Sequence, residues 1–314
     1  MTGGDVLRIG TRGSALASWQ ARHVAARLEA LPDRPAIELV EIQTEGDRSV
    51  LPLWSQPGKA FFTKEIEQAL LDGLVDVAVH SLKDLATELP PGLAIGAVLQ
   101  REDPRDVLLS RHGGDLDALP AGARVGTSSL RRHALLARWR GDLVLPDLRG
   151  NVPTRIDRLD AGDFDAIVLA AAGVKRLGLE GRVGAFLPPA RFPPAVGQGA
   201  IALQVRADDH ATLRRARLLD DAATRRAVSA ERALLRRLEG GCQVPVGALA
   251  TELDGTLSLS AVVCSLDGRR SVEGRREGAA ARAEELGRSL AGELLDRGAE
   301  EILAAIRTPA GGRS

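Results

Sequence analysis

Two side chains in this sequence have the chemistry of a reaction centre, and the first is Asp84. It ends the run His80-Ser81-Leu82-Lys83-Asp84, which follows an expected buried strand at 75–79. A carboxylate at the carboxyl end of such a strand lies where open α/β sheets bind ligands. Two plainer roles stay open, namely a helix N-cap or solvated loop for Asp84 and a surface ion pair with Lys83.

The second is Cys242, which follows two glycines in a loop and precedes Gln243-Val244-Pro245, so its thiol could meet an electrophile. A buried structural cysteine is an equally open interpretation. The other cysteine, Cys264, closes the apolar run 257–263, where a small buried side chain is expected. Two cysteines cannot build a disulfide framework or a four-ligand zinc site, so we expect a reducing compartment, the cytoplasm.

Several hydroxyl-rich and arginine-rich motifs have the chemistry of anion sites. Thr11-Arg12-Gly13-Ser14 and Thr127-Ser128-Ser129 each lie where an expected strand gives way to a helix, and the amides of a helix N-terminus bind carboxylates or phosphates. Ordinary N-capping would explain either motif alone. Arginines follow two other expected strands, at 148–155 and at Arg176. Because 38 of the 42 basic residues are arginine, solvated roles for these stay open.

Composition narrows the class of protein. The chain has 314 residues, of which 44% are hydrophobic and 27% charged, as expected for a globular protein of two or three domains and not for a collagen-like or disordered chain. Lys plus Arg equals Asp plus Glu at 42 each, so no general positive field attracts nucleic acid. The N-terminus lacks a signal-peptide pattern, and the longest uncharged apolar run, 166–174, is too short to span a bilayer. We therefore expect no nucleic-acid and no membrane partner.

Familiar nucleotide, hydrolase and metal motifs are missing from the sequence. The segment 197–202 fits G-x-G-x-x-A formally, but a strand-like stretch follows it and no strand precedes it, so we expect no nucleotide site there. The sequence has no Walker A motif, no G-x-S-x-G and no histidine pair at metal-binding spacing. Neither serine-hydrolase chemistry nor a bound metal is expected.

The elements that must position these residues alternate between strand and helix over the first two thirds of the chain. This pattern is typical of parallel sheets flanked by helices. The expected strands are 6–10, 75–79, 124–127, 143–146, 167–170 and 201–205, and the expected helices begin at about Ser14, at Thr63 and at Ser129.

Part of this pattern occurs twice. The segment 8–11 resembles 124–127, and 73–79 resembles 162–168 in the same order. We interpret the repeat as two related domains joined by crossings rich in Pro and Gly. After about Asp220, a helix, alternating strands at 248–251 and 257–264, and a leucine-rich closing helix indicate a separate α+β domain. The expected domains are lobe 1 at 1–100 with 197–219, lobe 2 at 101–196, and a C-terminal domain at 220–314.

Taken together, these motifs resemble the porphobilinogen deaminase family, also called hydroxymethylbilane synthases, from Leu7 to about Ile306. The matching motifs, in chain order, are Gly10-Thr11-Arg12-Gly13-Ser14, Val79-His80-Ser81-Leu82-Lys83-Asp84, Gly126-Thr127-Ser128-Ser129-Leu130-Arg131-Arg132, Leu148-Arg149-Gly150-Asn151, Ala195-Val196-Gly197-Gln198-Gly199 and Glu239-Gly240-Gly241-Cys242-Gln243-Val244-Pro245. The resemblance implies an α/β fold with two doubly wound open-sheet lobes like type II periplasmic binding proteins, plus a C-terminal α+β domain.

The resemblance also implies a function in tetrapyrrole and heme biosynthesis. The family enzyme is a cytoplasmic, monomeric transferase that joins four porphobilinogen molecules head to tail with loss of ammonia and releases hydroxymethylbilane by hydrolysis. The chain grows on a dipyrromethane cofactor held through a thioether. Every pyrrole ring carries acetate and propionate groups, so arginine forks suit this polyanion.

Residue by residue, the resemblance makes Asp84 the catalytic carboxylate and Cys242 the site of cofactor attachment. The residues matched to cofactor binding are Lys83, Ser81, Thr127, Ser128, Ser129, Arg131, Arg132, Arg155 and Gln198. Those matched to substrate binding are Arg12, Ser14, Arg149, Arg176 and Lys59. Three residues depart from the family pattern, since Ala86 replaces a common proline and Pro57 and Ala60 replace common glycines. We expect the turn after Asp84 and the mobility of 46–57 to differ accordingly.

Two other functions stay open on the sequence. A non-catalytic carboxylate-binding protein of the same two-lobed architecture would explain the anion motifs, but it would need neither Asp84 nor Cys242. A cysteine-dependent transferase would instead use Cys242 as a free thiolate for acyl transfer. A covalent adduct at Cys242 separates the family function from both alternatives.

Overall fold

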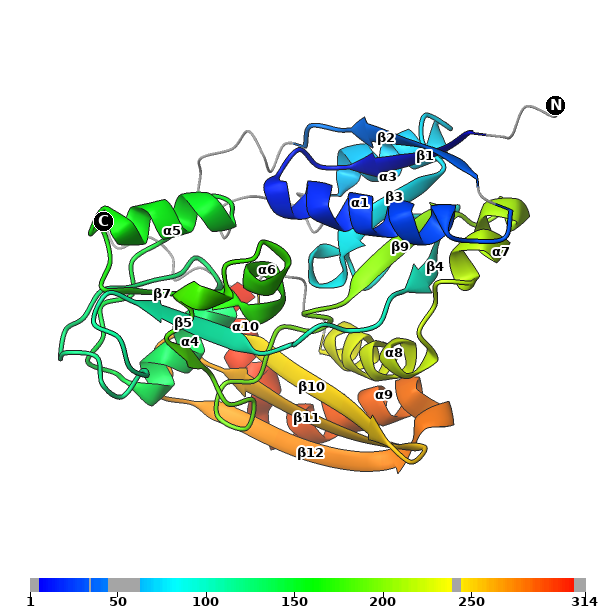
Figure 1. Ribbon diagram of the computed structural model, residues 1–314. Coiled ribbons are helices and arrows are strands. Elements are labelled where there is room, and N and C mark those ends of the chain that lie inside the picture. Colours follow the sequence, from blue (N-terminus) through cyan, green and yellow to red (C-terminus); the bar gives the residue numbers. More distant parts are fainter. Residues whose placement is uncertain (1–5, 34, 45–62, 239–243, 308–314) are drawn as a thin grey trace, which may run out of the picture. The chain divides into compact units, whose positions relative to one another are not determined.

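The computed structural model describes residues 6–33, 35–44, 63–238 and 244–307, and these residues form two compact units (Figure 1). The first unit holds the described parts of Met1–Leu51, Pro57–Glu102 and Gly199–Arg225, and the second holds Asp103–Gln198 and Arg226–Ser314. We call the first unit lobe 1, residues 103–198 of the second unit lobe 2, and the rest of the second unit the C-terminal domain. The finer division of the second unit stays a prediction. None of the helices in the described ranges is long and apolar enough to cross a membrane.

Lobe 1 is built on a five-stranded mixed sheet with the order β2-β1-β3-β9-β4 (Figure 1). β1 pairs in parallel with β2 and β3, whereas β9 pairs antiparallel with β3 and β4. The expectation of a parallel sheet is wrong for β9, because this strand returns to lobe 1 from the second crossing and runs back along β3. The strands are β1 Val6–Thr11, β2 Ala36–Glu41, β3 Val77–Ser81, β4 Leu93–Val98 and β9 Ile201–Arg206.

Helices cover both faces of this sheet, as a doubly wound fold requires. α1 (Ala15–Glu29) and α7 (His210–Arg217) contribute to one core, which includes Val24, Leu28, Leu203 and Ala216. α3 (Lys64–Leu71) contributes to the core on the other face, which includes Ile66, Leu70, Val75 and Ala78. The two cores fix β3 from both sides, so the residues that follow β3 start from a rigid base.

Lobe 2 repeats this plan with a four-stranded sheet in the order β6-β7-β5-β8. β6 pairs in parallel with β7, and β5 pairs antiparallel with β7 and β8. β5 enters the lobe from the first crossing, so it runs against β7 as β9 runs against β3. The strands are β5 Asp106–Ser110, β6 Val125–Gly126, β7 Ala166–Ala170 and β8 Ala185–Phe186, and the helices are α4 Leu130–Trp139, α5 Val152–Asp160 and α6 Ala171–Arg176.

The two lobes share one local construction at the start of their parallel strand pairs. In lobe 1, Asp76 N donates to Arg8 O at 2.8 Å, and the Asp76 carboxylate accepts from Arg8 N at 3.0 Å. In lobe 2, Asp165 N donates to Arg124 O at 2.9 Å, and the Asp165 carboxylate accepts from Arg124 N at 2.8 Å. We call this pair of bonds the Arg–Asp clasp. It confirms the repeat expected from the sequence, because each clasp precedes the buried strand β3 or β7.

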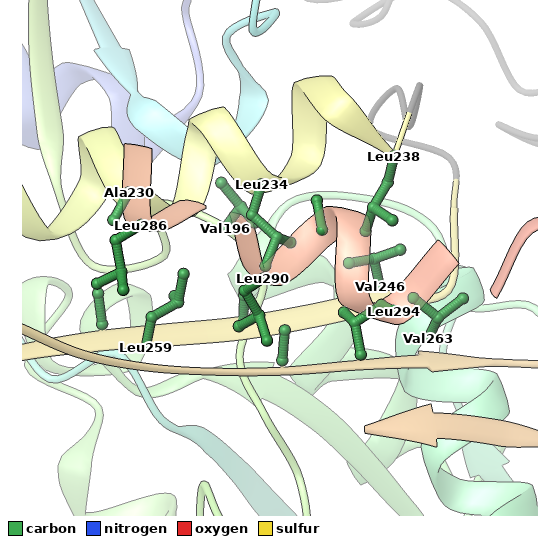
Figure 2. Close-up of a cluster of buried hydrophobic side chains, with 14 of the residues drawn as sticks. Val196, Ala230, Leu234, Leu238, Val246, Leu259, Val263, Leu286, Leu290 and Leu294 are labelled. Atoms are coloured by element: carbon green, nitrogen blue, oxygen red, sulfur yellow. The ribbon is translucent and has the colours of Figure 1, made fainter. Parts of the chain in front are cut away.

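The C-terminal domain packs a three-stranded antiparallel meander against helices. Its strands are β10 (Val246–Leu253), β11 (Thr256–Cys264) and β12 (Ser271–Ala279), which pair in that order. Figure 2 shows Leu234 of α8 (Ala222–Arg237), Leu290 of α9 (Ala283–Leu294) and Leu259 of β11 in the shared core. Gly298 turns the chain between α9 and α10 (Glu300–Arg307) with φ 100°, a conformation that favours glycine.

Lobe 2 and the C-terminal domain are joined by a common core and by a close backbone contact. Val262 and Cys264 of β11 are buried with residues of lobe 2 such as Phe192. Gly268, in the turn between β11 and β12, has φ 71°, and a Cβ there would lie 2.3 Å from Arg138 N. The helix that carries Arg131 and Arg132 is therefore held against the domain that carries the loop of Cys242.

Two expected strands differ in the structure, and several strands, β12 among them, were not expected. The stretch 143–146 makes one parallel bridge, between Val144 and Arg124, and Pro146 has no N–H with which to extend a ladder. β3 begins two residues later than expected, because Val75 N still bonds Ala69 O after the end of α3. β12 was missed because its sequence, SVEGRREGA, mixes charged residues and glycine and is mostly exposed.

Candidate active site

The Asp84 carboxylate lies just beyond the carboxyl end of β3. A short 3-10 turn, Leu82–Asp84, follows the strand, and Leu82 N donates to Ala200 O at 3.0 Å, which keeps the turn attached to the sheet. Leu82 is buried, whereas Asp84 is half-buried and its carboxylate receives no hydrogen bond or ion pair from the described residues. Asp84 ends this turn, so the N-cap role left open above is wrong, and no ion pair joins it to Lys83.

Ser81, the last residue of β3, is held by a side chain of α1. Gln20 Nε2 donates to Ser81 Oγ at 2.9 Å, and Gln20 Oε1 lies 3.2 Å from the same oxygen. Gln20 is buried, so the contact fixes the strand end from which Lys83 and Asp84 continue. Sequence reasoning missed Gln20, because the partners are 61 residues apart and a glutamine inside a helix carries no signal of its own.

The hydroxyls of Thr11 and Ser14 are engaged in the start of α1. Ser14 is the N-cap and accepts from Ala17 N at 3.3 Å, while the buried Thr11 hydroxyl donates to Ala17 O at 3.1 Å. Of the two interpretations of this motif, an anion site and an N-cap, the N-cap accounts for the hydrogen bond of Ser14. Arg12 is half-buried and directly follows β1, in which Gly10 pairs with Ala78 of β3, so Arg12 lies near the carboxyl end of β3.

Three buried polar side chains form a hydrogen-bond network that includes His80 of β3. His80 Nε2 lies 2.9 Å from Gln204 Oε1, and Gln204 Nε2 donates to Glu67 Oε1 at 2.9 Å. Burial is the main cause that lowers the pKa of His80 to about 4, and the Arg12 charge lowers it further, so His80 is neutral at pH 7. Burial likewise raises the pKa of Glu67. The sequence did not predict this hydrogen-bond network, which links β3 to β9 and α3.

In lobe 2 the three hydroxyl residues at the start of α4 also bond to the protein itself. Ser129 is the N-cap and accepts from Arg132 N at 3.4 Å, and Thr127 Oγ1 accepts from Ser129 N at 3.2 Å. Ser128 Oγ donates to Leu148 O at 2.8 Å, which draws the loop of Arg149 toward the start of α4. The structure thus brings together two of the motifs that the sequence singled out in lobe 2.

Arg131 and Arg132 share one buried carboxylate. Arg131 Nη1 lies 2.7 Å from Asp106 Oδ2, and Arg132 donates to Asp106 Oδ1 from Nη2 at 2.7 Å and from Nε at 3.1 Å. Burial alone would raise the pKa of Asp106, but the two arginine charges lower it to about 2. Burial also lowers the pKa of Arg131. Two cations around one anion leave a net positive charge at this place, which suits an anionic ligand.

Gln198 joins the same cluster from the second crossing segment. It is 1% exposed, and its Nε2 donates to Pro104 O at 2.8 Å and to Asp106 Oδ1 at 3.0 Å. Pro104 belongs to the first crossing segment, so Gln198 ties the lobe 2 ends of both crossings to Asp106. Asp106 itself was missed, because an aspartate at the first position of a strand has no distinguishing sequence pattern.

The other lobe 2 arginines that the sequence singled out, Arg149, Arg155 and Arg176, lie in or next to α5 and α6. Asn151 is the N-cap of α5 and accepts from Thr154 N at 2.9 Å, while Arg155 Nε donates to Gly150 O at 2.7 Å. Arg149 Nη1 is buried and has no hydrogen-bond partner among the described residues. Arg176 ends α6 and is half-buried. A buried guanidinium nitrogen without a partner in the described ranges, in a loop that Arg155 also contacts, is suited to a carboxylate ligand.

Several predicted residues lie outside the described ranges. Cys242 and Lys59 are among them, as are Pro57, Ala60 and the rest of 46–57. Their predicted roles stay predictions. The described residues on either side of Cys242 are Leu238, which is buried beyond the end of α8, and Val244, just before β10.

Comparisons with known proteins match almost the whole chain. Residues 7–214 match the family model described as porphobilinogen deaminase, dipyromethane cofactor binding domain, and residues 225–296 match the porphobilinogen deaminase C-terminal domain. A porphobilinogen deaminase of Syntrophobacter fumaroxidans is 50% identical over 302 residues, which cover 96% of this chain and 98% of that protein.

Solved structures are similar at a much lower level. A putative methionine-binding lipoprotein of Bacillus subtilis aligns with a TM-score of 0.42 and 12% identity, covering 67% of this chain and 87% of that one. The periplasmic aliphatic sulphonate binding protein SsuA of Escherichia coli aligns with a TM-score of 0.38 and 17% identity, covering 76% of this chain and 71% of that one. The family models and the 50% identical relative carry the conclusion: this chain belongs to the porphobilinogen deaminase family.

Proposed function

We propose that this chain joins four porphobilinogen molecules head to tail, with loss of ammonia at each step, and releases hydroxymethylbilane by hydrolysis. Membership of the porphobilinogen deaminase family supports the reaction. The observation that carries the chemistry is Asp84, a half-buried carboxylate at the carboxyl end of β3 that no cation among the described residues neutralises. Such a group is suited to stabilise a positive charge that develops on a substrate.

Asp84 would act on the cation formed from porphobilinogen. When the C–N bond of the protonated aminomethyl group breaks, the electron pair leaves with the nitrogen as neutral ammonia, and the positive charge stays on the pyrrole as an azafulvenium cation. At ~4 Å and an effective dielectric constant of ~20, a carboxylate stabilises this cation by ~4 kcal/mol, or about three orders of magnitude in rate. The turn Leu82–Asp84, held by the bond from Leu82 N to Ala200 O just before β9, would keep the carboxylate in place.

The residues of lobe 2 fit a dipyrromethane cofactor with acidic side chains. The Asp106 cluster has one more cation than anions, and Arg149 has a buried nitrogen without a partner in the described ranges. Carboxylates would satisfy both features. When bound, the cofactor supplies the nucleophilic carbon to which the first porphobilinogen is joined. We propose that Thr127, Ser128, Ser129, Arg131, Arg132, Arg155 and Gln198, with Ser81 and Lys83 of lobe 1, hold it.

The substrate's own acetate and propionate groups need cations as well. We propose that Arg12, Arg149, Arg176 and Lys59 bind them together with Ser14. Arg12 directly follows β1, which pairs in parallel with β3, so it lies near the end of the strand that leads to Asp84. A charged hydrogen bond removed from water contributes ~1.5–3 kcal/mol, against ~0–1 kcal/mol for a surface pair, so a few of these contacts should dominate binding.

The cofactor would be attached through a thioether at Cys242. Cys264 is not a competing site, because it is buried and burial raises the pKa of its thiol to about 11. Intact-protein mass spectrometry tests the attachment: the wild-type chain should carry an adduct of dipyrromethane mass that Cys242→Ser lacks. Cys264→Ala is the matched control and should keep the adduct.

The same measurements separate this proposal from its alternatives. An acyl transferase using a free Cys242 thiolate would be inactivated by alkylation, whereas on our proposal the thiol is already occupied and alkylation of the holoprotein at Cys242 is negligible. A carboxylate-binding protein would carry no adduct and release no ammonia from porphobilinogen. An unmodified wild-type chain with full activity would reject the proposed attachment.

Location and assembly belong to the same proposal. We propose a cytoplasmic monomer that needs neither nucleic acid nor a membrane, in keeping with the balance of 42 basic and 42 acidic residues. Sedimentation equilibrium should return the mass of one chain, and a concentration-dependent dimer would contradict the assignment.

A further inference from the structure

Asp106 is the residue on which the arginine pair of lobe 2 depends. Its side chain is fully buried, and each carboxylate oxygen meets a different arginine: Oδ2 meets Arg131 Nη1 at 2.7 Å, and Oδ1 meets Arg132 Nη2 at 2.7 Å. Without this carboxylate, two guanidinium charges would repel each other in a site with little water. The Asp106 carboxylate therefore allows the two guanidinium groups to be buried close to each other.

The contacts of Arg131 leave one edge of its guanidinium group unused. Nη1 is taken up by Asp106 and donates to Pro193 O at 2.7 Å. Nε is buried without a hydrogen-bond partner in the described ranges, and the polar contacts of Arg131 with the described residues all use Nη1. The Nε and Nη2 edge is the one that binds a carboxylate with two parallel hydrogen bonds. The Arg131 guanidinium also lies 5.8 Å from the centroid of the Phe192 ring, which limits its rotation.

The contacts of Arg132 are different. Its Nε and Nη2 edge is spent on Asp106, and Nη1 donates to Val168 O at 2.9 Å. Arg132 is thus turned toward the protein and contributes to the proposed cofactor site through Asp106, whereas Arg131 keeps a free edge for a carboxylate. The two arginines, adjacent in sequence and alike in burial, have distinct tasks in this arrangement.

We propose that Asp106 is a positioning residue for carboxylate binding: it holds Arg131 by Nη1 so that the Nε and Nη2 edge faces a carboxylate ligand of the pyrrole acetate or propionate class, while Arg132 locks Asp106 in place. Gln198 supports the arrangement by donating to Asp106 Oδ1 at 3.0 Å. The proposal rests on the proposed function in that the ligand is a cofactor or substrate carboxylate. Asp106 acts through Arg131 and touches no ligand itself.

The test compares loading of the cofactor with folding. Apoprotein is incubated with porphobilinogen, and the fraction carrying the adduct is followed by intact-protein mass spectrometry, normalised to the folded fraction from circular dichroism. Asp106→Asn keeps the shape of the side chain but removes its charge, so loading should slow by about tenfold to a hundredfold, the range of one charged hydrogen-bond pair. Asp103→Asn is the control, because Asp103 lies three residues earlier and pairs with Arg105 at 2.7 Å; it should load at the wild-type rate.

A second comparison keeps the proposal falsifiable if Asp106→Asn folds poorly. Arg132→Gln retains the pairing of Asp106 with Arg131, whereas Asp106→Asn combined with Arg132→Gln removes one charge of each sign and keeps the net charge of the cluster. The double variant should fold as well as Arg132→Gln but load at least tenfold more slowly. Equal loading of the two would overturn the positioning role, as would normal loading of folded Asp106→Asn.

The outcomes also separate this inference from the proposed function. If the wild-type chain never acquires the adduct, the proposed function fails, whatever the variants do. If the wild-type chain loads and Asp106→Asn loses thermal stability but loads normally per folded molecule, Asp106 is structural and only the positioning role fails.

Discussion

Lobe 1 and lobe 2 begin with the same Arg–Asp clasp and the same serine N-cap, yet equivalent positions hold apolar residues in lobe 1 and charged residues in lobe 2. Asp76 and Asp165 are equivalent through the clasps, so Ser81 and Ala170, five residues on, are equivalent too. Their antiparallel partners are Ile201 in β9 and Asp106 in β5. The first residue of the strand that returns from a crossing is therefore apolar in one lobe and a buried anion in the other.

The first turns of α1 and α4 show the same difference, with apolar residues in lobe 1 and charged residues in lobe 2. Counting from the N-caps Ser14 and Ser129, the second and third residues of the helix are Leu16 and Ala17 in lobe 1 but Arg131 and Arg132 in lobe 2. Lobe 2 thus holds a charged cluster where lobe 1 packs small or apolar groups. The comparison teaches that exchanging apolar for charged residues at three positions lets the same strand-turn-helix unit hold guanidinium groups for anions in lobe 2, whereas lobe 1 presents its carboxylate, Asp84, from the turn after β3.

The largest expected effect comes from the acid of lobe 1. Asp84→Asn should lower kcat by about a thousandfold, the rate equivalent of ~4 kcal/mol of cation stabilisation, while the adduct stays on Cys242. Product formation measures the loss of kcat, and the intact mass of the same sample shows whether the adduct is retained. Asp72→Asn is a suitable control, since Asp72 is an acid in lobe 1 whose carboxylate accepts from Gln68 at 2.8 Å, and it should turn over normally. Substantial activity in Asp84→Asn would show that another group meets the cation.

The clasps should differ in strength although their backbone bonds are alike. Asp76 pairs with Arg8 at 2.9 Å and Arg206 at 3.0 Å and is 13% exposed, whereas Asp165 pairs with His112 at 3.1 Å and is 31% exposed. We expect Asp76→Asn to lower the free energy of unfolding by about 2–3 kcal/mol and Asp165→Asn by about 1 kcal/mol or less. Urea titrations followed by circular dichroism compare them, and equal losses would mean that the backbone bonds alone matter.

The sequence predicted the repeated part of this comparison but not the difference. The clasp segments and N-cap serines are local patterns of a few residues, so the repeat, the helix starts and the family motifs could be read directly. The bond of Gln20 to Ser81 spans 61 residues and that of His80 to Gln204 spans 124, and no local pattern encodes such partners. Arg131 and Arg132 were singled out, but six Arg-Arg pairs in the sequence made their shared use of Asp106 invisible.

A third prediction contrasts the two lobes by pH. The pKa of His80 is about 4 in the folded chain against ~6.5 when unfolded, so between these values the unfolded state binds more protons and stability falls as the pH falls. The expected loss is about 2 kcal/mol between pH 7 and pH 5. The pKa of Asp106 is lowered from 3.8 to about 2, so its contribution to stability is lost only as the pH falls below about 4. The loss that we expect between pH 7 and pH 5 therefore comes from His80 in lobe 1 and not from Asp106 in lobe 2.

Variants isolate the His80 contribution from its neighbours. Glu67, whose pKa is raised, works in the opposite direction, but it is present in both the wild type and His80→Gln and cancels in their difference. Urea titrations at pH 7 and pH 5 should show a smaller loss for His80→Gln by about 2 kcal/mol. His112→Gln changes an exposed histidine of lobe 2 and should keep the wild-type loss. A loss in His80→Gln equal to the wild type would rule out a neutral buried His80.

The smallest expected effects come from the two serine N-caps, and they test whether the caps also bind ligands. Ser14→Ala and Ser129→Ala should each lower the free energy of unfolding by about 1 kcal/mol, because both hydroxyls accept from a helix N–H, at 3.3 Å and 3.4 Å. Aspartate caps a helix as well as serine does, so Ser14→Asp and Ser129→Asp should restore this stability. The added negative charge would, however, repel a ligand carboxylate at the same helix start and raise KM for porphobilinogen or slow cofactor loading. A lobe in which the aspartate variant folds, loads and turns over like the wild type uses its serine for capping alone, and the proposed ligand contact of that serine would then be wrong.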